Sequence, residues 1–276
     1  MSIFQPVTLV TGASSGIGAA LARVFAEHGH EVAMVARREA QLGAVADAIA
    51  SAGHKKPHAI AIDLARSDSP ARIAHELLAR GLEPAIVVNN AGFGLYGPAA
   101  KLDRAQQLEM IDVNVRTLTD LSLRWIESLI RHKGGILNVA SVAGFLPGPG
   151  MAVYSASKAY VLSFTESLHR ELKERGLRVT ALCPGPVRTE FQRRAGMSEK
   201  LPRLLLRAPE RVAQEGYAAF MEGRPLVVPG LGNRLVVSLP RLLPRKVTAG
   251  LVGRSLRSRA SRKSAAWSRR GQGKGE

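Results

Sequence analysis

Tyr154 and Lys158, four residues apart, are the pair in this sequence whose spacing carries the clearest chemistry. On a helix, this spacing places both side chains on one face, where an ammonium can stabilise a phenolate at a pH at which free tyrosine is protonated. Ser141 lies upstream on the same stretch. Such a pair suits proton transfer to or from a carbonyl oxygen.

A glycine-rich segment near the start predicts a nucleotide site. Residues 11–18 read Thr-Gly-Ala-Ser-Ser-Gly-Ile-Gly and lie between an apolar run at 7–10 and a helical pattern at 19–28. Gly12 can make the turn, Gly16 lets the backbone approach a phosphate, and Gly18 allows close packing of helix on sheet. Helix amides at this junction favour a dinucleotide pyrophosphate. A nucleotide beside a proton donor indicates hydride transfer.

Short apolar runs alternate with amphipathic helical patterns and must position these residues. We expect strands at 7–10, 31–36, 58–62, 85–89, 135–140, 178–182 and 226–228, and helices at 19–28, 38–52, 69–80, 102–132, 153–175 and 210–222. This alternation predicts one α/β domain with a Rossmann-like, doubly wound parallel sheet of about seven strands and helices on both faces. Its ligand should lie beyond the carboxyl ends of the strands. Six of those ends are followed by Gly12, Arg37, Asp63, Asn90, Ser141 and Gly185.

Two arginines follow the second expected strand, where sites that prefer NAD usually carry an acid. Guanidinium groups at Arg37 and Arg38 could bind a 2′-phosphate bidentately, which favours NADP, and Ser14 and Ser15 could add hydroxyl contacts. The alternative is two solvated arginines at the start of a helix. Asp63, with Leu64 beside it, could hold the adenine edge or cap the next helix.

The sequence resembles the short-chain dehydrogenase/reductase family over residues 6–230. The motifs that carry the resemblance are residues 11–18, Asn89-Asn90-Ala91-Gly92, Asn114, Ser141, Tyr154, Lys158, and Pro184-Gly185 with Thr189. It implies that Tyr154 is a general acid in carbonyl reduction and a general base in alcohol oxidation, with its pKa lowered by Lys158 and the nicotinamide charge. It also implies that Lys158 bonds the nicotinamide ribose, Ser141 orients the substrate oxygen and Asn114 holds a water that connects Lys158 to solvent.

The expected cofactor site follows from the glycine segment, the arginines and this resemblance. Its residues are Gly12, Ser14, Ser15, Gly16, Ile17, Gly18, Arg37, Arg38, Asp63, Leu64, Asn90, Ala91, Gly92, Val113, Tyr154, Lys158, Pro184, Gly185, Val187 and Thr189. Taken one at a time, Tyr154 could be an amphipathic core residue, Lys158 a solvated one, Ser141 a cap and Asn114 a polar contact inside a helix. The intact set argues against a non-catalytic, cofactor-sensing scaffold.

An apolar crevice is expected for the substrate. Its expected wall consists of Phe93, Leu95, Tyr96, Ala143, Phe145, Leu146, Pro147, Met151 and Phe191. Residues 192–208 could cover it, or could be a surface connection with an apolar underside. This wall favours a lipid-like or steroid-like ketone. The alternative is a 3-oxoacyl thioester on an acidic carrier, which Arg193, Arg194 and the basic end of the chain could attract.

Positive charge is concentrated at the carboxyl end. The net charge is +17, and residues 231–276 hold twelve Lys or Arg against the single acid Glu276. We therefore expect a catalytic domain at 1–230, an amphipathic basic helical extension at 231–257 and a disordered basic tail at 258–276. The extension could lie on an anionic membrane surface, or it could cover the pocket of the catalytic domain or a partner subunit. Nucleic acid is disfavoured, because Trp267 is the only aromatic residue there.

The remaining features bound the class of protein. No apolar run reaches the roughly 18 residues of a membrane span, and the start lacks a secretory pattern, so a cytoplasmic protein is expected. Cys183 is the only cysteine and is expected to be a small buried residue, and the seven histidines are scattered, which makes a metal site improbable. The helices at 102–132 and 153–175 carry surplus apolar side chains, which predicts a homodimer or homotetramer.

Overall fold

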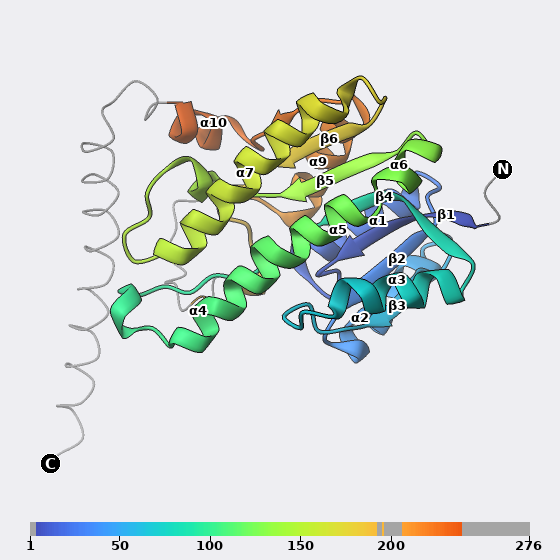
Figure 1. The fold of residues 1–276 in the computed structure, drawn as a ribbon, viewed down its shortest axis with the longest axis horizontal. Coiled ribbons are helices and arrows are strands. Elements are labelled where there is room, and N and C mark those ends of the chain that lie inside the picture. Colours follow the sequence, from blue (N-terminus) through green and yellow to red (C-terminus); the bar gives the residue numbers. More distant parts are fainter. Residues whose placement is uncertain (1–3, 192–194, 196–205, 239–276) are drawn as a thin grey trace, which may run out of the picture.

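The computed structural model describes residues 4–191, 195 and 206–238 of the chain. Its centre is a sheet of seven parallel strands in the order β3-β2-β1-β4-β5-β6-β7, which confirms the predicted α/β fold (Figure 1). The strands are β1 Gln5–Thr11, β2 Val32–Ala36, β3 His58–Ala61, β4 Leu82–Asn89, β5 Gly135–Val139, β6 Arg178–Leu182 and β7 Leu226–Val227. β1 lies between β2 and β4, so the chain order reverses there and opens a crevice at the strands' carboxyl ends.

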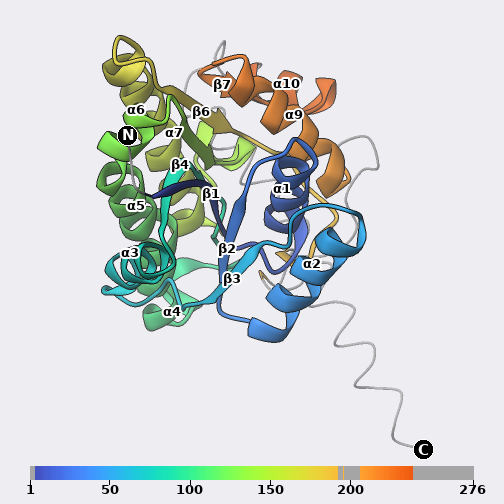
Figure 2. The same ribbon diagram turned by 90° about the vertical axis from the view of Figure 1, so that its right-hand side faces the viewer.

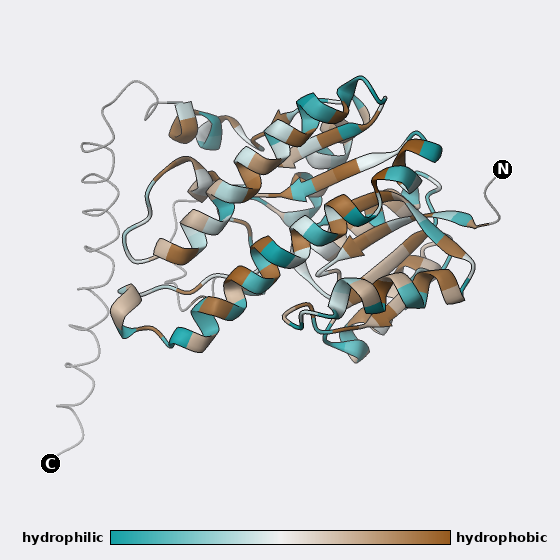
Figure 3. Cartoon of the chain, viewed as in Figure 1, coloured by the Kyte–Doolittle hydropathy of each residue, from teal (hydrophilic) through white to brown (hydrophobic). Residues whose placement is uncertain are grey.

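Helices cover both faces of the sheet. They are α1 Gly16–Glu27, α2 Glu39–Ser51, α3 Ser69–Ala79, α4 Arg104–Ile111, α5 Leu118–Arg124, α6 Ile126–Arg131, α7 Ala152–Lys173, α9 Pro209–Met221 and α10 Leu231–Ser238. Figure 2 shows α1, α2 and α9 on one side of the strands and α3, α5 and α7 on the other. Each layer buries its own apolar cluster, one around Phe25 and Phe220 and the other around Leu77 and Leu121. Both faces of the strands are apolar for this reason, and hydrophobic colouring runs along them in Figure 3.

The helix expected at 102–132 is divided. α4 is followed by a π-helical stretch, Asp112–Thr117, then by α5, and the chain bends at Trp125 before α6. A π-helical turn inserts one extra residue per turn and changes which side chains face inward. Here it directs the fully buried Asn114 into the protein, toward the crevice.

α10 packs onto the sheet domain through two buried residues. Val237 joins the apolar cluster around Val161 and Cys183, and the Asn233 amide donates to the Pro229 carbonyl (2.9 Å). Leu231 and Leu235 on this helix are 73% and 71% exposed. Residues 239–276 lie outside the described part of the chain, so the predicted domain boundaries stay predictions. Within the described ranges, no helix is long and apolar enough to cross a membrane.

Candidate functional site

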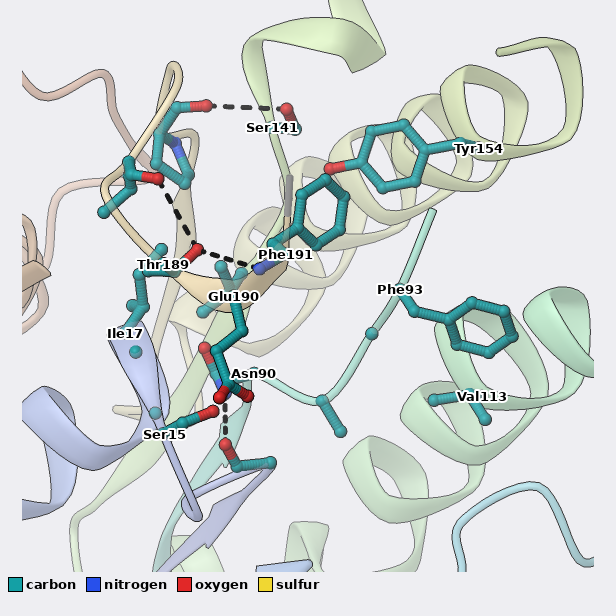
Figure 4. Close-up of a pocket in the computed structure, with 18 of the residues that line it drawn as sticks. Ser15, Ile17, Asn90, Phe93, Val113, Ser141, Tyr154, Thr189, Glu190 and Phe191 are labelled. Atoms are coloured by element: carbon teal, nitrogen blue, oxygen red, sulfur yellow. Dashed lines mark hydrogen bonds between the residues drawn. The ribbon is translucent and has the colours of Figure 1, made fainter. Parts of the chain in front are cut away.

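A cavity of about 460 Å³ opens at the carboxyl ends of the strands. All the residues expected to contact a cofactor line it, Tyr154 and Lys158 among them, and so does Ser141. Figure 4 shows part of this lining, with Ser15, Asn90, Ser141 and Tyr154 labelled. Asn114 does not line it but lies directly behind the wall. The fold therefore brings the residues singled out in the sequence to one place.

The glycine segment closes one side of the cavity by close backbone contacts. Gly12 has a φ of +66°, and a methyl group there would lie 2.8 Å from the Ala91 Cα atom. A methyl on Gly18 would collide with the Gly12 carbonyl oxygen. The Asn90 amide donates to the Thr11 carbonyl (2.9 Å), and the Thr11 hydroxyl accepts the Asn90 backbone N–H (3.0 Å). These bonds fix the turn after β1 against the end of β4.

The facing side is the turn that follows β6. A methyl on Gly16 would lie 2.9 Å from Cγ2 of Thr189, so this turn approaches the glycine segment closely. Gly185 is in contact with the Asn233 side chain, which leaves no room for a side chain at 185. α10 thus supports the turn from behind.

At the end of the cavity near β2, Arg38 is surrounded by hydrogen-bonding groups. Its guanidinium donates to the hydroxyls of Ser14 (3.2 Å) and Ser15 (2.9 Å) and forms an ion pair with Glu190 (2.9 Å). Its side chain is 28% exposed. An arginine and two hydroxyls converging on one point are a suitable donor set for a phosphate monoester.

Arg37 is held more loosely. Its Nη1 atom lies 3.3 Å from Glu109 and 3.8 Å from Asp63, and its side chain is 56% exposed. Asp63 also accepts the backbone N–H of Ala65 (3.1 Å), so it caps the turn after β3 while lining the cavity. The alternative role of Asp63 as cap of the next helix is wrong, because Asp68 occupies the N-cap position of α3.

At the opposite end, Tyr154 and Lys158 are buried, at 7% and 4% exposure. Burial raises the pKa of Tyr154 to about 12, and a hydrogen bond with the Ser141 side chain opposes this rise. Burial also lowers the pKa of Lys158 to about 8. The Lys158 Nζ atom lies 6.0 Å from the centre of the Tyr154 ring and donates to the Val139 carbonyl (2.8 Å). Burial is thus the largest influence on the Tyr154 pKa in the protein without a nucleotide. The lowering expected from Lys158 together with the nicotinamide charge stays a prediction.

Asn114 makes a short hydrogen-bonded bridge behind Lys158. Its carbonyl oxygen accepts the Phe93 N–H (3.1 Å), and its amide donates to the Phe93 carbonyl and to the Ser157 hydroxyl (3.0 Å each). A methyl added to Gly92 would lie 2.9 Å from Asn114 Oδ1 and 3.4 Å from Lys158 Nζ. Both polar atoms thus approach the same glycine.

The expected substrate wall is only partly assembled at the cavity. Phe93, Ala143, Met151 and Phe191 line it, while Leu95 and Tyr96 pack in the same apolar cluster without lining it. Phe145 packs instead against the cluster around Val161, so its placement in the wall is wrong. The short helix η3 Val142–Phe145 contacts α10, and the cluster against which Phe145 packs includes Val237 of that helix. Most of the expected cover, residues 192–208, lies outside the described ranges.

Two acids of the site, Glu109 and Glu190, were absent from the sequence-based set. Both line the cavity and pair with the arginines. Glu190 follows the motif residue Thr189 directly, but its partner is 152 positions away in sequence. No local pattern could have identified this pair.

Comparison with known proteins agrees with the geometry. A family profile for short chain dehydrogenases matches residues 6–200. Sulfoacetaldehyde reductase 2 of Chromohalobacter salexigens is 37% identical over 67% of this chain and 74% of its own. A short-chain dehydrogenase from Sphingobium yanoikuyae in complex with NADPH is 31% identical, with a TM-score of 0.74 over 86% of this chain and 91% of the other.

A bulky-bulky ketone specific alcohol dehydrogenase from Comamonas testosteroni is 28% identical, with a TM-score of 0.71 over 86% of this chain and 93% of its own. The chain belongs to the short-chain dehydrogenase family. It is an oxidoreductase of the type that acts on alcohols and carbonyl compounds. Gly12, Gly16 and Gly18, where an added methyl would meet neighbouring atoms, and the donors around Arg38 fit a dinucleotide of the NAD(P) type.

Proposed function

We propose that this protein is an NADP(H)-dependent reductase that interconverts an apolar ketone and its secondary alcohol. The observation that carries the cofactor choice is the cluster of Arg38, Ser14 and Ser15, which offers charged and hydroxyl donors at the end of β2. An acid that would bond ribose hydroxyls in an NAD site is absent from positions 37 and 38. The related structure that holds NADPH supports the same choice.

Tyr154, Ser141 and Lys158, at the buried end of the cavity, each have a separate role in the reduction of the carbonyl group. A bound nicotinamide supplies or accepts the hydride. With its pKa raised to about 12, the Tyr154 phenol keeps its proton at neutral pH and can donate it to a carbonyl oxygen, which suits reduction. The Ser141 hydroxyl orients that oxygen, and Lys158, with a pKa near 8, returns a proton by way of the polar atoms around Asn114.

The substrate proposal rests on the apolar side chains beside Tyr154. Phe93, Met151 and Phe191 surround the phenol and offer no charged group. Such a wall suits a bulky apolar ketone better than a small charged aldehyde, although the relative from Chromohalobacter is named for one. Reduction of a 3-oxoacyl thioester is the alternative.

The test is a panel of aryl and alicyclic ketones, 3-oxoacyl thioesters and sulfoacetaldehyde, with NADPH or NADH consumption followed by absorbance. We expect turnover of bulky ketones and a kcat/KM at least tenfold higher with NADPH. Equal kcat/KM for the two nucleotides would overturn the cofactor choice. Preferred turnover of sulfoacetaldehyde would overturn the substrate class.

Assembly into a homo-oligomer is supported by apolar side chains left uncovered on neighbouring helices. Four apolar side chains on α4, α5 and α7 are 40–48% exposed: Leu108, Ile111, Leu123 and Tyr160. In Figure 1, α5 continues the line of α4, and α7 runs beside them. Light scattering should give at least twice the mass of the 29.5 kDa chain. A monomer at micromolar concentration would exclude this assembly.

Contact with an anionic membrane surface is supported by the two exposed leucines of α10, which precede the most basic part of the sequence. Co-sedimentation with phosphatidylserine vesicles should remove the full chain from solution, and Leu231→Ser with Leu235→Ser should weaken this. Equal pelleting of both proteins would exclude a role for these leucines, and a wild-type protein that stays in solution would exclude the membrane contact. The cytoplasmic location stays a prediction of the sequence.

A further inference from the structure

We propose that Asn233 is a positioning residue for the reacting end of the cavity, where Ser141 and Tyr154 lie. Asn233 belongs to α10 and does not line the cavity itself. It acts through the turn at Pro184 and Gly185, which does line it. The inference rests on the proposed hydride-transfer function and deepens it, because it makes the geometry of the reacting end depend on a helix that follows the last strand.

The side chain of Asn233 lies directly against Gly185. If a methyl group were added at Gly185, its three nearest atoms would be Oδ1, Cγ and Nδ2 of Asn233, and they would collide with it. The φ of Gly185 is not positive, so the contact with Asn233, and not the backbone conformation, requires a glycine here. The amide of Asn233 therefore sets how far this part of the cavity wall can move back.

Asn233 has a fixed orientation because it is buried and hydrogen-bonded. It is 3% exposed, and its Nδ2 atom donates to the Pro229 carbonyl (2.9 Å). The next residue, Gly230, has a φ of +84° and lies against the guanidinium of Arg207. The backbone N–H of Arg207 donates to the Pro186 carbonyl (3.1 Å), in the same turn that Asn233 supports. A buried amide with its hydrogen bond made is a rigid support for this turn.

The supported turn is bonded to the segment that carries Ser141. The Pro184 carbonyl accepts the Val142 N–H (3.0 Å). The Ala140 N–H donates to the Leu182 carbonyl (2.8 Å), so two backbone bonds flank Ser141 and continue the pairing of β5 with β6. The Ser141 hydroxyl also faces the Pro184 carbonyl at 3.5 Å (Figure 4). A shift of the turn should therefore move the hydroxyl that orients the substrate oxygen.

An exchange of side-chain size between positions 185 and 233 tests the contact. Gly185→Ala alone places a methyl group against Asn233, and we expect about tenfold weaker binding of NADPH in calorimetry. In the double variant Gly185→Ala with Asn233→Ala the methyl group has room, so the Kd should return to within about threefold of the wild-type value. A double variant that binds NADPH no better than Gly185→Ala would overturn the proposal.

Asn233→Ala alone tests the effect on the reacting end. It leaves a gap behind Gly185, and we expect kcat to fall about tenfold and the Kd for NADPH to rise about fivefold. Adenosine 2′,5′-bisphosphate has no nicotinamide and should bind this variant as tightly as the wild type. Asn233→Ser should change the ratio of the two Kd values in the same direction, and it serves if the alanine variant does not fold.

Val237→Ala is the matched control, because it loosens the same helix in the apolar cluster around Val161 and Cys183. It should lower stability and leave the ratio of the two Kd values unchanged. If the wild type binds NADPH and reduces ketones, but the Asn233 variants leave the ratio unchanged or Val237→Ala changes it as much, Asn233 only stabilises the fold and the proposed function stands. If the wild type does not bind NADPH, both proposals fail.

Discussion

The two ends of the cavity differ in their electrostatic environment. Near β2, Arg37 and Arg38 are partly exposed and their charges are balanced by Glu109, Asp63 and Glu190. Near β5, Tyr154 and Lys158 are buried, and hydrogen bonds with neutral groups surround them. Solvent screens the first set, while desolvation shifts the pKa of each member of the second.

This difference predicts which single substitutions should have large effects on turnover and stability. An exposed ion pair contributes about 1 kcal/mol or less, so changes near β2 should alter nucleotide selectivity by modest factors. A buried hydrogen-bonded group has no water to replace its partner, so changes near β5 should affect turnover and stability strongly. The following substitutions test this contrast.

Tyr154→Phe should have the largest effect, because it removes the proton donor and leaves the ring that packs on Phe191. We expect kcat to fall by about 10³-fold with little change in the Kd for NADPH. Tyr160→Phe is the matched control, since this phenol lies on the same helix and bonds Thr119 at the surface. If Tyr154→Phe keeps a tenth of the wild-type kcat, Tyr154 is not the acid.

Asn114→Ala should lower both stability and turnover. It leaves the backbone N–H and carbonyl of Phe93 without their partner, which should cost about 2 kcal/mol of unfolding free energy. We also expect a shifted pH profile of kcat, because the polar path beside Lys158 is broken. Asn89→Ala removes another buried asparagine, bonded to Ser122 and Asn138, and should destabilise without moving the profile. Identical profiles for the two variants would reduce Asn114 to a structural role.

Lys158→Met should remove a pH dependence of stability. The pKa of Lys158 is about 8 in the folded protein against 10.5 in the unfolded chain, so between these values the unfolded state binds the extra proton. The unfolding free energy of the wild type should therefore rise with pH above about 8, relative to the variant, by at most about 1.4 kcal/mol per pH unit. Denaturant titrations at pH 7 and 9.5 measure this difference. Parallel curves would mean that Lys158 has an ordinary pKa.

Arg38→Gln and Arg37→Gln should have the smallest effects and should differ from each other. Loss of Arg38 removes a guanidinium held by two hydroxyls, and we expect the KM for NADPH to rise about tenfold with little change for NADH. Loss of the more exposed Arg37 should raise the KM for NADPH about twofold. Steady-state kinetics with both nucleotides decide this, and a larger effect from Arg37 would reverse the assignment of the phosphate site.

Local sequence patterns predicted the strands and turns that neighbouring residues determine. β6 begins and ends where alternation of apolar runs placed it, and the glycine segment lies at the expected turn. The π-helical stretch at Asn114 was missed, because apolar spacing does not encode the hydrogen-bond register within a helix. The pairs of Arg37 and Arg38 with Glu109 and Glu190 were missed, because only the folded chain brings them together. The raised pKa of Tyr154 depends on the depth of burial, which motif spacing does not report.

The account depends on direct hydride transfer beside Tyr154 to a bulky ketone. NADPH that carries deuterium in place of both hydrogens on nicotinamide C4 measures this transfer, with the alcohol product analysed by mass spectrometry and NMR. We predict one deuterium at the carbinol carbon of the wild-type product, a primary isotope effect in single turnover, and almost no product from Tyr154→Phe. An unlabelled carbinol carbon, or labelled alcohol formed at the wild-type rate by Tyr154→Phe, would contradict it.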